Sequence, residues 1–255
     1  MGARLGQHFL FDPAILGRIA DAALPERVGC VLEIGPGKGP LTRELARRAD
    51  RVVAVEADRR LADALRAAPP APNVEIVCGD ALKVPWPAAD VVCGNIPYQI
   101  TSPLIARALT PPRPVRIVFL IQREVADRLV APPGSRTYGA LSAAVQLVAD
   151  VERLFTVRAG AFRPPPQVES ALVRITPRPA DQVPSPAEEE ATRRLIQALF
   201  QRRRQQLQRS LRESTGLSPE RVERILHDLD VAPKARAEEL GPQQFLALAR
   251  VMATP

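Results

Sequence analysis

The stretch Glu33-Ile34-Gly35-Pro36-Gly37-Lys38-Gly39 lies between an apolar run that ends at Ile34 and a helical pattern that starts at Leu41. Glycines at such a junction allow the backbone to turn tightly and to approach a ligand closely. The spacing G-x-G-x-G lacks the G-K-[ST] of a phosphate-binding P-loop, and Pro40 breaks the G-x-G-x-x-G pattern of dinucleotide-binding folds. We interpret the stretch as a ligand-binding loop after a buried strand; a plain tight turn is the competing interpretation.

Outward from this loop, short β-type runs alternate with helical patterns over the first 176 residues. Such alternation is typical of an α/β fold with a parallel sheet. The run at 115–121 is nearly continuously apolar, as expected for a strand that is covered on both faces. We expect strands at 30–34, 51–56, 74–78, 90–94, 115–121, 151–157 and 171–176, and helices at 41–48 and 59–67.

A proline-rich segment interrupts this pattern after residue 177. Four prolines between Pro177 and Pro186 exclude a continuous helix or a central strand there. Beyond them the strand pattern stops, and helical patterns follow at 188–200, 205–214, 219–229 and 242–252. The sequence therefore predicts an α/β domain over 1–177, a linker at 178–186 and a small all-α domain over 187–255.

Two carboxylates follow the next two predicted strands. Glu56 ends the strand at 51–56, where a carboxylate can accept both hydroxyls of a ribose. Asp80 follows the strand at 74–78, where a carboxylate can accept the exocyclic amine of an adenine. Together with the glycine loop they predict a site for an adenosine-bearing cofactor, and without a diphosphate-type fingerprint S-adenosylmethionine fits better than NAD. Exposed acidic turns are the alternative.

The segment Asn95-Ile96-Pro97-Tyr98 follows the predicted strand at 90–94. An aromatic amine is a poor nucleophile, and methyl transfer from a sulfonium needs the lone pair of the nitrogen in line with the S–CH₃ bond. The Asn95 side-chain oxygen and a backbone carbonyl held outward by Pro97 can accept both amine hydrogens, and Tyr98 supplies a flat face for an extruded base. We interpret the segment as a binding site for a target amine. The alternative is a turn with a packed tyrosine.

A second aromatic residue, Phe162, lies in a proline-stiffened loop at 161–170. Such a loop loses little entropy on binding, so that Phe162 could close the other side of the base. The alternative is a phenylalanine of the hydrophobic core.

The composition excludes several classes of protein. With 255 residues, 46% hydrophobic and 25% charged, the chain is neither disordered, collagen-like nor a bare coiled coil. It has no run of 18 apolar residues and no apolar leader, which predicts a cytoplasmic protein without a membrane partner. Three widely spaced cysteines and two histidines predict neither a metal site nor a disulfide framework.

The charge is unusual, because 35 basic residues oppose 28 acidic ones for a net charge of +7. Of the cations, 32 are arginine and 3 are lysine. A basic chain favours a polyanionic partner such as nucleic acid. The codon usage of a GC-rich genome is the alternative explanation for the scarcity of lysine.

Motifs spread over nearly the whole chain resemble those of the ribosomal RNA adenine N6,N6-dimethyltransferases, in particular the bacterial small-subunit enzymes of this family. The matching segments follow the order of the family and lie at 6–10 (GQHFL), 33–39 (EIGPGKG), 55–56 (VE), 79–81 (GDA), 95–100 (NIPYQI), 122–126 (QREVA), 138–142 (YGALS) and 162–170 (FRPPPQVES).

The resemblance implies a class I S-adenosylmethionine-dependent methyltransferase with a Rossmann-like, seven-stranded, mostly parallel sheet, one antiparallel strand near its end, and a small all-α C-terminal domain. The implied substrate is two adjacent adenosines near the 3′ end of 16S rRNA, each methylated twice within the small (30S) ribosomal subunit during its biogenesis. We expect a monomer without a metal.

The resemblance also implies residue roles. Residues expected to contact S-adenosylmethionine are His8, Leu10, Gly35, Gly37, Glu56, Asp80, Ala81 and Asn95. Residues expected to handle the target base are Asn95, Pro97, Tyr98 and Phe162.

Three departures from the family pattern matter for these roles. Gln99 stands where asparagine is frequent after the tyrosine. His8 stands where the family often has asparagine, and either side chain can form hydrogen bonds. Gln167 stands where a basic residue is common, so we expect the loop at 163–167 to contact RNA less strongly.

An arginine-rich segment in the predicted helical domain is the candidate RNA surface. Residues 193–212 include seven arginines and no acidic residue. Within this segment we expect RNA to be bound by Arg202, Arg203, Arg204 and Arg209. A solvated helix face with unpaired arginines is the alternative.

Two further functions remain open. One is the related large-subunit enzyme that confers macrolide resistance, although the segments at 122–126 and 138–142 look more like the small-subunit enzyme. The other is a ribosome-assembly or nucleic-acid-binding factor that kept the fold without catalysis. Intact Glu56, Asp80, Asn95 and Tyr98 argue against lost catalysis.

Overall fold

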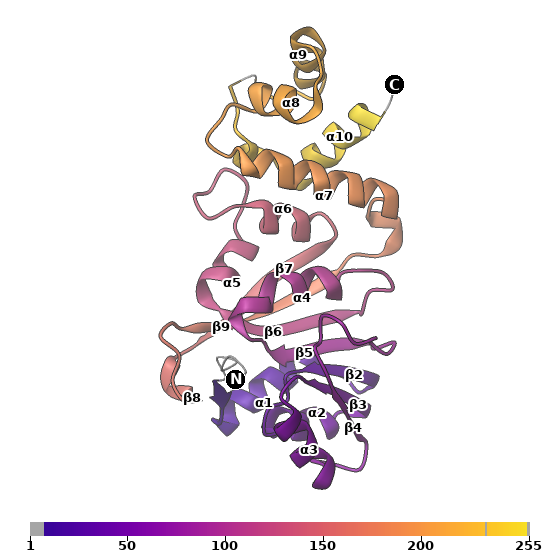
Figure 1. The fold of residues 1–255 in the computed structure, drawn as a ribbon, viewed down its shortest axis with the longest axis vertical. Helices are drawn as coiled ribbons and strands as arrows, with labels where there is room; N and C mark the ends of the chain where they lie inside the picture. The colour runs from indigo at the N-terminus through magenta and orange to yellow at the C-terminus, as the bar shows by residue number, and fades with distance from the viewer. Residues whose placement is uncertain (1–7, 233, 254–255) are drawn as a thin grey trace. The chain divides into compact units, whose positions relative to one another are not determined.

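The structure of the chain is a computed structural model that describes residues 8–232 and 234–253 (Figure 1). Gly6 and Gln7 of the first family motif lie outside these residues. The chain divides into two compact units. Unit 1 comprises the described residues of Met1–Ala126 and Val151–Pro177, and unit 2 comprises those of Asp127–Asp150 and Arg178–Pro255.

A seven-stranded sheet has the strand order β4-β3-β2-β5-β6-β9-β7. Its strands are β2 (Val28–Ile34), β3 (Ala49–Glu56), β4 (Val74–Cys78), β5 (Val91–Asn95), β6 (Arg116–Gln122), β7 (Ala149–Val157) and β9 (Ser170–Pro177). The pairs from β4 to β6 are parallel, whereas β9 runs antiparallel to β6. The expected mostly parallel sheet, with one antiparallel strand near its end, is therefore confirmed.

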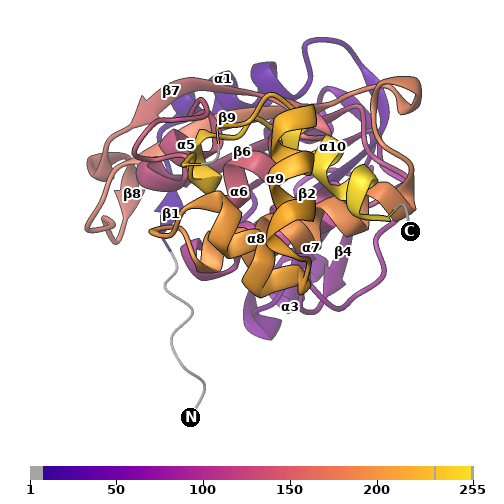
Figure 2. The ribbon, with the colours of Figure 1, turned by 90° about the horizontal axis from the view of Figure 1, so that it is seen from above.

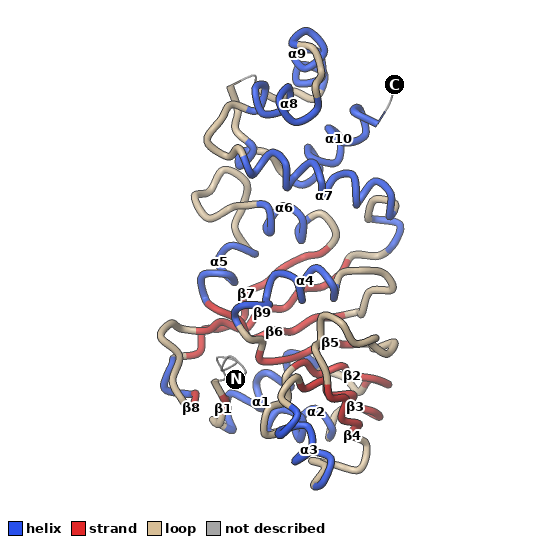
Figure 3. Tube along the Cα trace, viewed as in Figure 1, coloured by secondary structure: helices blue, strands red, loops and turns tan. Residues whose placement is uncertain are grey.

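Short pairings and helices complete unit 1, as the trace in Figure 3 shows. A two-stranded ribbon joins β1 (Phe9–Leu10) to β8 (Phe162–Arg163) in antiparallel register. The helices are α1 (Pro13–Ala23), α2 (Pro40–Ala46), α3 (Arg59–Ala67), α4 (Thr101–Ala108) and the start of α5 (Arg123–Leu129), with single 3-10 turns at Tyr98–Ile100 and Ala159–Ala161.

Local sequence signals explain where the helices of unit 1 begin. Asp12 caps α1, since its side chain accepts hydrogen bonds from the N–H groups of Ala14 and Ile15, and Pro13 occupies the first turn. Asp58 caps α3 in the same way. These caps fix where the two helices begin.

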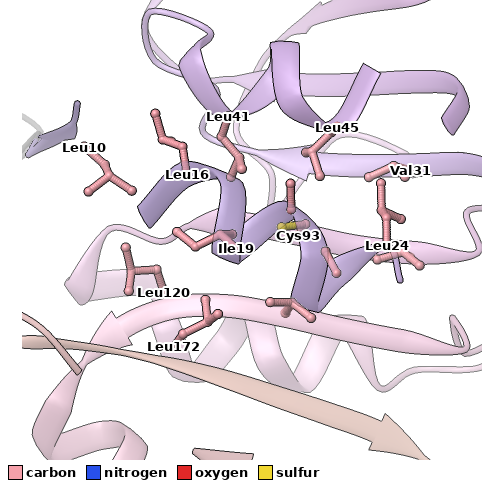
Figure 4. Packing of buried hydrophobic residues seen from close by; sticks show 14 of the residues in the cluster. Leu10, Leu16, Ile19, Leu24, Val31, Leu41, Leu45, Cys93, Leu120 and Leu172 are labelled. Carbon is pink, nitrogen blue, oxygen red and sulfur yellow. The ribbon is translucent and has the colours of Figure 1, made fainter. Parts of the chain in front are cut away.

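The core of unit 1 lies between the sheet and the helices α1 and α2. Figure 4 shows Leu16 and Ile19 of α1 near Leu41 and Leu45 of α2, with Cys93 of β5 in the same cluster. Alternate residues of the strands point to the opposite face, where Leu32, Val92 and Phe119 are also buried. Both faces of the sheet are therefore covered, as the continuous apolar run in β6 predicts.

Unit 2 is helical and has its own core. Its helices are α6 (Ala140–Gln146), α7 (Pro186–Gln201), α8 (Leu207–Thr215), α9 (Pro219–Asp228) and α10 (Pro242–Ala253), with 3-10 turns at Ala180–Gln182 and Ala237–Glu239. Helix α7 begins with a capping box, in which Ser185 and Glu188 bond to each other's backbone N–H groups. In Figures 1 and 2, α8 and α9 lie side by side, and the two helices contact each other.

The predicted division of the chain differs from the observed units in one segment. Residues 127–150 group with the C-terminal helices, although the sequence-based boundary assigned them to the α/β domain. The reason is aromatic and apolar packing, because Tyr138 contacts Phe200 and both belong to a cluster that includes Phe245. Helix α6 contributes Ala143 to the same cluster.

Among the residues that the structure describes, no helix has both the length and the apolar character needed to cross a membrane.

Candidate functional site

The glycine loop between β2 and α2 adopts a backbone that favours glycine. Gly35, Gly37 and Gly39 all have positive φ angles, of 71°, 60° and 80°. A Cβ atom at Gly37 would also lie 3.0 Å from the ring of Phe9. The backbone of this loop therefore requires glycine at these positions, and its role in ligand binding stays a prediction.

Glu56 at the end of β3 is tied to this loop. Its Oε2 accepts a hydrogen bond of 2.9 Å from the N–H of Gly37, and its Oε1 accepts one of 2.9 Å from the N–H of Asp58. Burial raises the pKa of the carboxyl group, which is 4% exposed, while these N–H groups act in the opposite direction. The carboxylate is thus held in one orientation with lone pairs available for further donors.

Asn95 at the end of β5 is anchored by the N-terminal segment. Its Nδ2 donates a hydrogen bond of 2.9 Å to the carbonyl oxygen of His8. The same His8 places its Nδ1 at 2.8 Å from the carbonyl oxygen of Pro164. Because the amide nitrogen is used in this way, Oδ1 is the atom of Asn95 that remains available to accept from an amine.

Tyr98 begins the turn after β5 and is fixed at its hydroxyl group. The hydroxyl oxygen lies 2.9 Å from Oγ of Ser170, the buried first residue of β9. The Tyr98 ring lies near the imidazole of His8, with 6.1 Å between ring centroids. The neighbouring Pro97 carbonyl accepts from the N–H of Ile100, which closes the turn.

These residues line one pocket at the carboxyl ends of β2, β3 and β5. Of the residues singled out in the sequence, the pocket brings together His8, Leu10, Gly35, Gly37, Glu56, Asn95, Pro97 and Tyr98. The order of strands predicts this meeting, because the ends of neighbouring parallel strands lie at one edge of the sheet.

Asp80 and Ala81 follow β4, at the outer edge of the sheet, and are not among the residues that line this pocket. Oδ1 of Asp80 accepts from the N–H of Leu82 at 2.9 Å, and Oδ2 lies 3.7 Å from Nζ of Lys83. The Ala81 carbonyl accepts from the indole N–H of Trp86. Their contact with an adenine stays a prediction.

Phe162 lies in the hydrophobic core of unit 1 rather than on the pocket wall. Its side chain is 2% exposed, and its residue pairs with Leu10 in the β1–β8 ribbon. In this arrangement Phe162 stabilises the N-terminal segment, because it pairs with Leu10 and belongs to the same core cluster. Its predicted stacking on a base would require the ring to leave this packing.

Glu33 is a residue of the pocket wall to which the sequence analysis assigned no role. Its side chain is 1% exposed, and burial raises the pKa of its carboxyl group to about 8. Within the described part of the chain, no group forms a hydrogen bond with its Oε2. The signal in the sequence was a charged residue inside an otherwise apolar strand, directly before the glycine loop.

The candidate RNA-binding arginines belong to unit 2 and are largely ion-paired. Arg202 and Arg209 lie 3.2 Å and 2.7 Å from carboxylate oxygens of Glu213. Arg203 lies 3.2 Å from Glu238 and also donates to the carbonyl oxygen of Arg136 at 2.9 Å. Arg204 is exposed and has no ion-pair partner among the described residues.

A family model described as "Ribosomal RNA adenine dimethylase" matches residues 2–254. A ribosomal RNA small subunit methyltransferase A from Bordetella pertussis is 43% identical over 250 residues, which cover 96% of this chain and 92% of that protein. A protein of the same name from Gloeobacter violaceus is 43% identical over 258 residues, which cover 98% and 93%.

Two solved structures are similar over most of the chain. A dimethyladenosine transferase from Plasmodium falciparum has a TM-score of 0.82 at 28% identity, with 94% of this chain and 96% of that chain covered. The 23S rRNA methyltransferase ErmE has a TM-score of 0.74 at 32% identity, with 95% and 98% covered. The methyltransferase fold expected from the sequence is confirmed, and the chain belongs to the ribosomal RNA adenine dimethylase family.

Proposed function

We propose that the protein dimethylates the N6 amines of two adjacent adenosines near the 3′ end of 16S rRNA in the small ribosomal subunit, with S-adenosylmethionine as methyl donor. The observation that carries the proposal is that Asn95, Pro97 and Tyr98 line the same pocket as the glycine loop and Glu56. An amine-orienting segment and an adenosine-binding segment are thus adjacent. The small-subunit name of relatives at 43% identity supports this substrate.

The pocket residues fit S-adenosylmethionine on two observations. A Cβ atom at Gly37 would lie 3.0 Å from the Phe9 ring, so the close packing of the glycine loop at this wall of the pocket depends on glycine. The buried Glu33 oxygen has no hydrogen-bond partner within the described residues, and an ammonium group beside it would favour the ionised carboxylate and donate to it. Glu56 would accept the ribose hydroxyls, and Asp80 would accept the adenine amine. When bound, the cofactor supplies an electrophilic methyl group.

The chain's own residues would prepare the amine. Asn95 is oriented through the His8 carbonyl, so that its Oδ1 can accept one N–H of the adenosine amine. Tyr98, held at its hydroxyl by Ser170, offers a fixed ring face to a base that has left its stack. No strong general base is needed, since the alkylated nitrogen becomes acidic and loses its proton to solvent. The proposal includes no metal, a monomeric protein and a cytoplasmic reaction.

The test is a methyl-transfer assay with labelled S-adenosylmethionine and small ribosomal subunits that lack the dimethylations. We expect label in two adjacent adenosines near the 3′ end of the 16S rRNA, and a loss of at least about 100-fold in rate for Asn95→Ala. No transfer to these subunits, with the wild-type protein folded and binding the cofactor, would contradict the proposal.

A second candidate function is methylation of large-subunit rRNA, and the similarity to the 23S rRNA methyltransferase ErmE favours it. The same assay with naked 23S rRNA distinguishes the two. Label in 23S rRNA alone would replace the first proposal, whereas label in small subunits alone would exclude the second. Tight subunit binding without transfer would instead favour an assembly factor.

A further inference from the structure

The N-terminal strap, which we define as residues 8–11, is held at the mouth of the pocket by several hydrogen bonds. The β1–β8 pairing extends to Phe11, whose N–H donates to the Ala161 carbonyl at 3.2 Å. The His8 imidazole bonds to the Pro164 carbonyl, and the His8 carbonyl accepts from Asn95. The side chains of the strap are therefore presented from a fixed backbone.

Two cations stack on the two phenylalanines of the strap. The guanidinium carbon of Arg163 lies 4.6 Å from the centroid of the Phe11 ring, and Nζ of Lys38 lies 5.3 Å from that of Phe9. Both distances are within the range of cation–π interactions. Among the described residues, neither cation has a carboxylate within ion-pair distance, so their charges are not neutralised by the protein.

Packing in the hydrophobic core does not explain why residue 11 is aromatic. The residue stands directly before the N-cap Asp12 of α1, a position from which an apolar side chain often packs back onto the helix. Leu10 and Leu16 do enter the core, but Phe11 remains 44% exposed. A large aromatic surface is thus kept in solvent beside a guanidinium group.

This surface adjoins the pocket along the strap. Phe9 and Phe11 stand on either side of Leu10 along the strap, and the N–H of Phe11 continues the β1–β8 pairing. Phe9 lines the pocket itself, and Lys38 belongs to the glycine loop. If the target base of an RNA enters the pocket, the nucleotide next to that base would reach Phe11 and Arg163.

We propose that Phe11 and Arg163, with Lys38 nearby, form a platform that binds the nucleotide next to the target adenosine. The inference rests on the proposed function. A base that is extruded leaves its neighbour without a stacking partner, and the Phe11 ring with its guanidinium replaces that partner. The uncompensated charges of Arg163 and Lys38 attract the adjoining phosphates.

The platform also changes an expectation about the loop at 163–167. Gln167 lacks the basic side chain that predicts RNA contact, and the loop was expected to bind RNA less strongly for that reason. In the structure the cation of this loop is its first residue, Arg163, and it is stacked on the strap.

The experiment compares Phe11→Ala and Arg163→Gln with the wild-type protein on unmethylated small subunits. We expect the KM for subunits to rise about tenfold for Phe11→Ala, in line with the loss of one base–aromatic stack, and several-fold for Arg163→Gln. The kcat at saturating subunits and the Kd for S-adenosylmethionine, measured by calorimetry, stay unchanged. Phe11→Trp should keep the KM of the wild-type protein, because tryptophan retains an aromatic surface.

Two control residues lie at the amino-terminal ends of the strands, away from the pocket. Val115→Ala removes another exposed apolar side chain, 60% exposed, and Arg27→Gln removes another exposed cation. Both should leave the KM for subunits unchanged. An unchanged KM in Phe11→Ala would overturn the platform, and so would a loss of cofactor affinity equal to the rise in KM, since the strap would then only cover the cofactor.

A binding measurement with labelled oligoadenylate separates this inference from the proposed function. If the wild-type protein transfers no methyl group to small subunits, the proposed function fails, but oligoadenylate affinity still tests the platform. Weaker binding by Phe11→Ala than by Val115→Ala would support it in that case, and equal binding would refute it.

Discussion

Two basic regions of this molecule use their charges in opposite ways. In the arginine-rich segment of unit 2, five of the seven arginines between 193 and 212 form ion pairs with carboxylates: Arg193, Arg194, Arg202, Arg203 and Arg209. At the mouth of the pocket in unit 1, Lys38 and Arg163 lie on phenylalanine rings. A cluster of cations in a sequence therefore does not measure the charge that is available to a partner.

The contrast extends to the acidic groups. The pocket keeps Glu33 Oε2 without a hydrogen-bond partner among the described residues, whereas Glu213 and Glu238 in unit 2 are occupied by arginines. Leaving a buried polar group unsatisfied costs stability, and proteins accept this cost mainly where a ligand satisfies the group. Unit 2 also contains buried atoms without a hydrogen-bond partner among the described residues, such as the Tyr138 hydroxyl, so the distinction concerns the carboxylates: Glu213 and Glu238 pair with arginines, and Glu33 at the pocket does not. Four variants, in order of decreasing expected effect, test this distinction.

The largest effect is expected for Glu33→Gln. Because the pKa of Glu33 is raised from 4.5 to about 8, the folded state keeps the proton while the unfolded state releases it. The free energy of unfolding therefore falls as the pH rises from about 4.5 to about 8, by up to a few kcal/mol from this group. The glutamine variant lacks this dependence and should be more stable than wild type at pH 8.

The measurement is thermal or urea unfolding of both proteins without cofactor across that pH range. The exposed residue Asp181 provides a control variant, Asp181→Asn. If the difference in stability between wild type and Glu33→Gln does not change with pH, the buried carboxyl group is not the cause.

Arg203→Ala tests whether the paired arginines stabilise unit 2. The change removes the ion pair with Glu238 and the hydrogen bond to the Arg136 carbonyl, and we expect a loss of about 1–2 kcal/mol, since the side chain is partly exposed. The control Arg194→Ala breaks an exposed pair one helical turn apart and should cost about 0.5 kcal/mol or less. Equal losses in urea unfolding would show that Arg203 has no special structural role.

The hydrogen bond between Tyr98 and Ser170 tests positioning within the pocket. Losing one neutral hydrogen bond of about 1 kcal/mol corresponds to about a fivefold lower kcat for Ser170→Ala, with the KM for subunits unchanged. Tyr98→Phe should show the same loss, the double variant no further loss, and Ser170→Thr a recovery. Additive losses in the double variant would mean that the two groups act separately.

The smallest effect is expected for Arg204→Ala in unit 2. Arg204 and Arg212 are both exposed and without an ion pair within the described residues, so these two arginines of the segment are best placed for phosphate contacts. The slope of log affinity for subunits against log salt should flatten by about 0.7. Arg209→Ala, which loses the ion pair with Glu213, should change it less. The reverse order would contradict the distinction between paired and unpaired arginines.

Much of the fold was predictable because hydrophobic periodicity depends on local sequence. The strand at 74–78 and the helix at 59–67 coincide with β4 and α3, and the four C-terminal helices agree with α7 to α10 within two residues. Helices α1 and α4 to α6 were not predicted. The signals of α4 and α6 were weak, since α4 carries Pro103 in its first turn and α6 is only seven residues long, whereas α1 has a clear start signal in Asp12 and Pro13 that the prediction missed.

The site was predictable to the extent that it follows strand order. Glu56 ends β3 and Asn95 ends β5, and both strands pair with β2. Any chain with this strand order brings the two residues together at the carboxyl ends of the strands. The β1–β8 ribbon holds His8 beside Asn95, although the two residues are far apart in the sequence. No local sequence pattern predicts this ribbon. The same holds for Ser170 beside Tyr98.

The sequence by itself determined the α/β class, the position of the glycine loop at a strand end, and the family. These depend on periodicity and on motif order, which are properties of the chain alone. The tertiary structure decided which charges are paired, which phenylalanines are buried, and that the side-chain nitrogen of Asn95 bonds to the His8 carbonyl. Such properties depend on the partners that folding brings within a few ångströms, and these partners are distant in sequence.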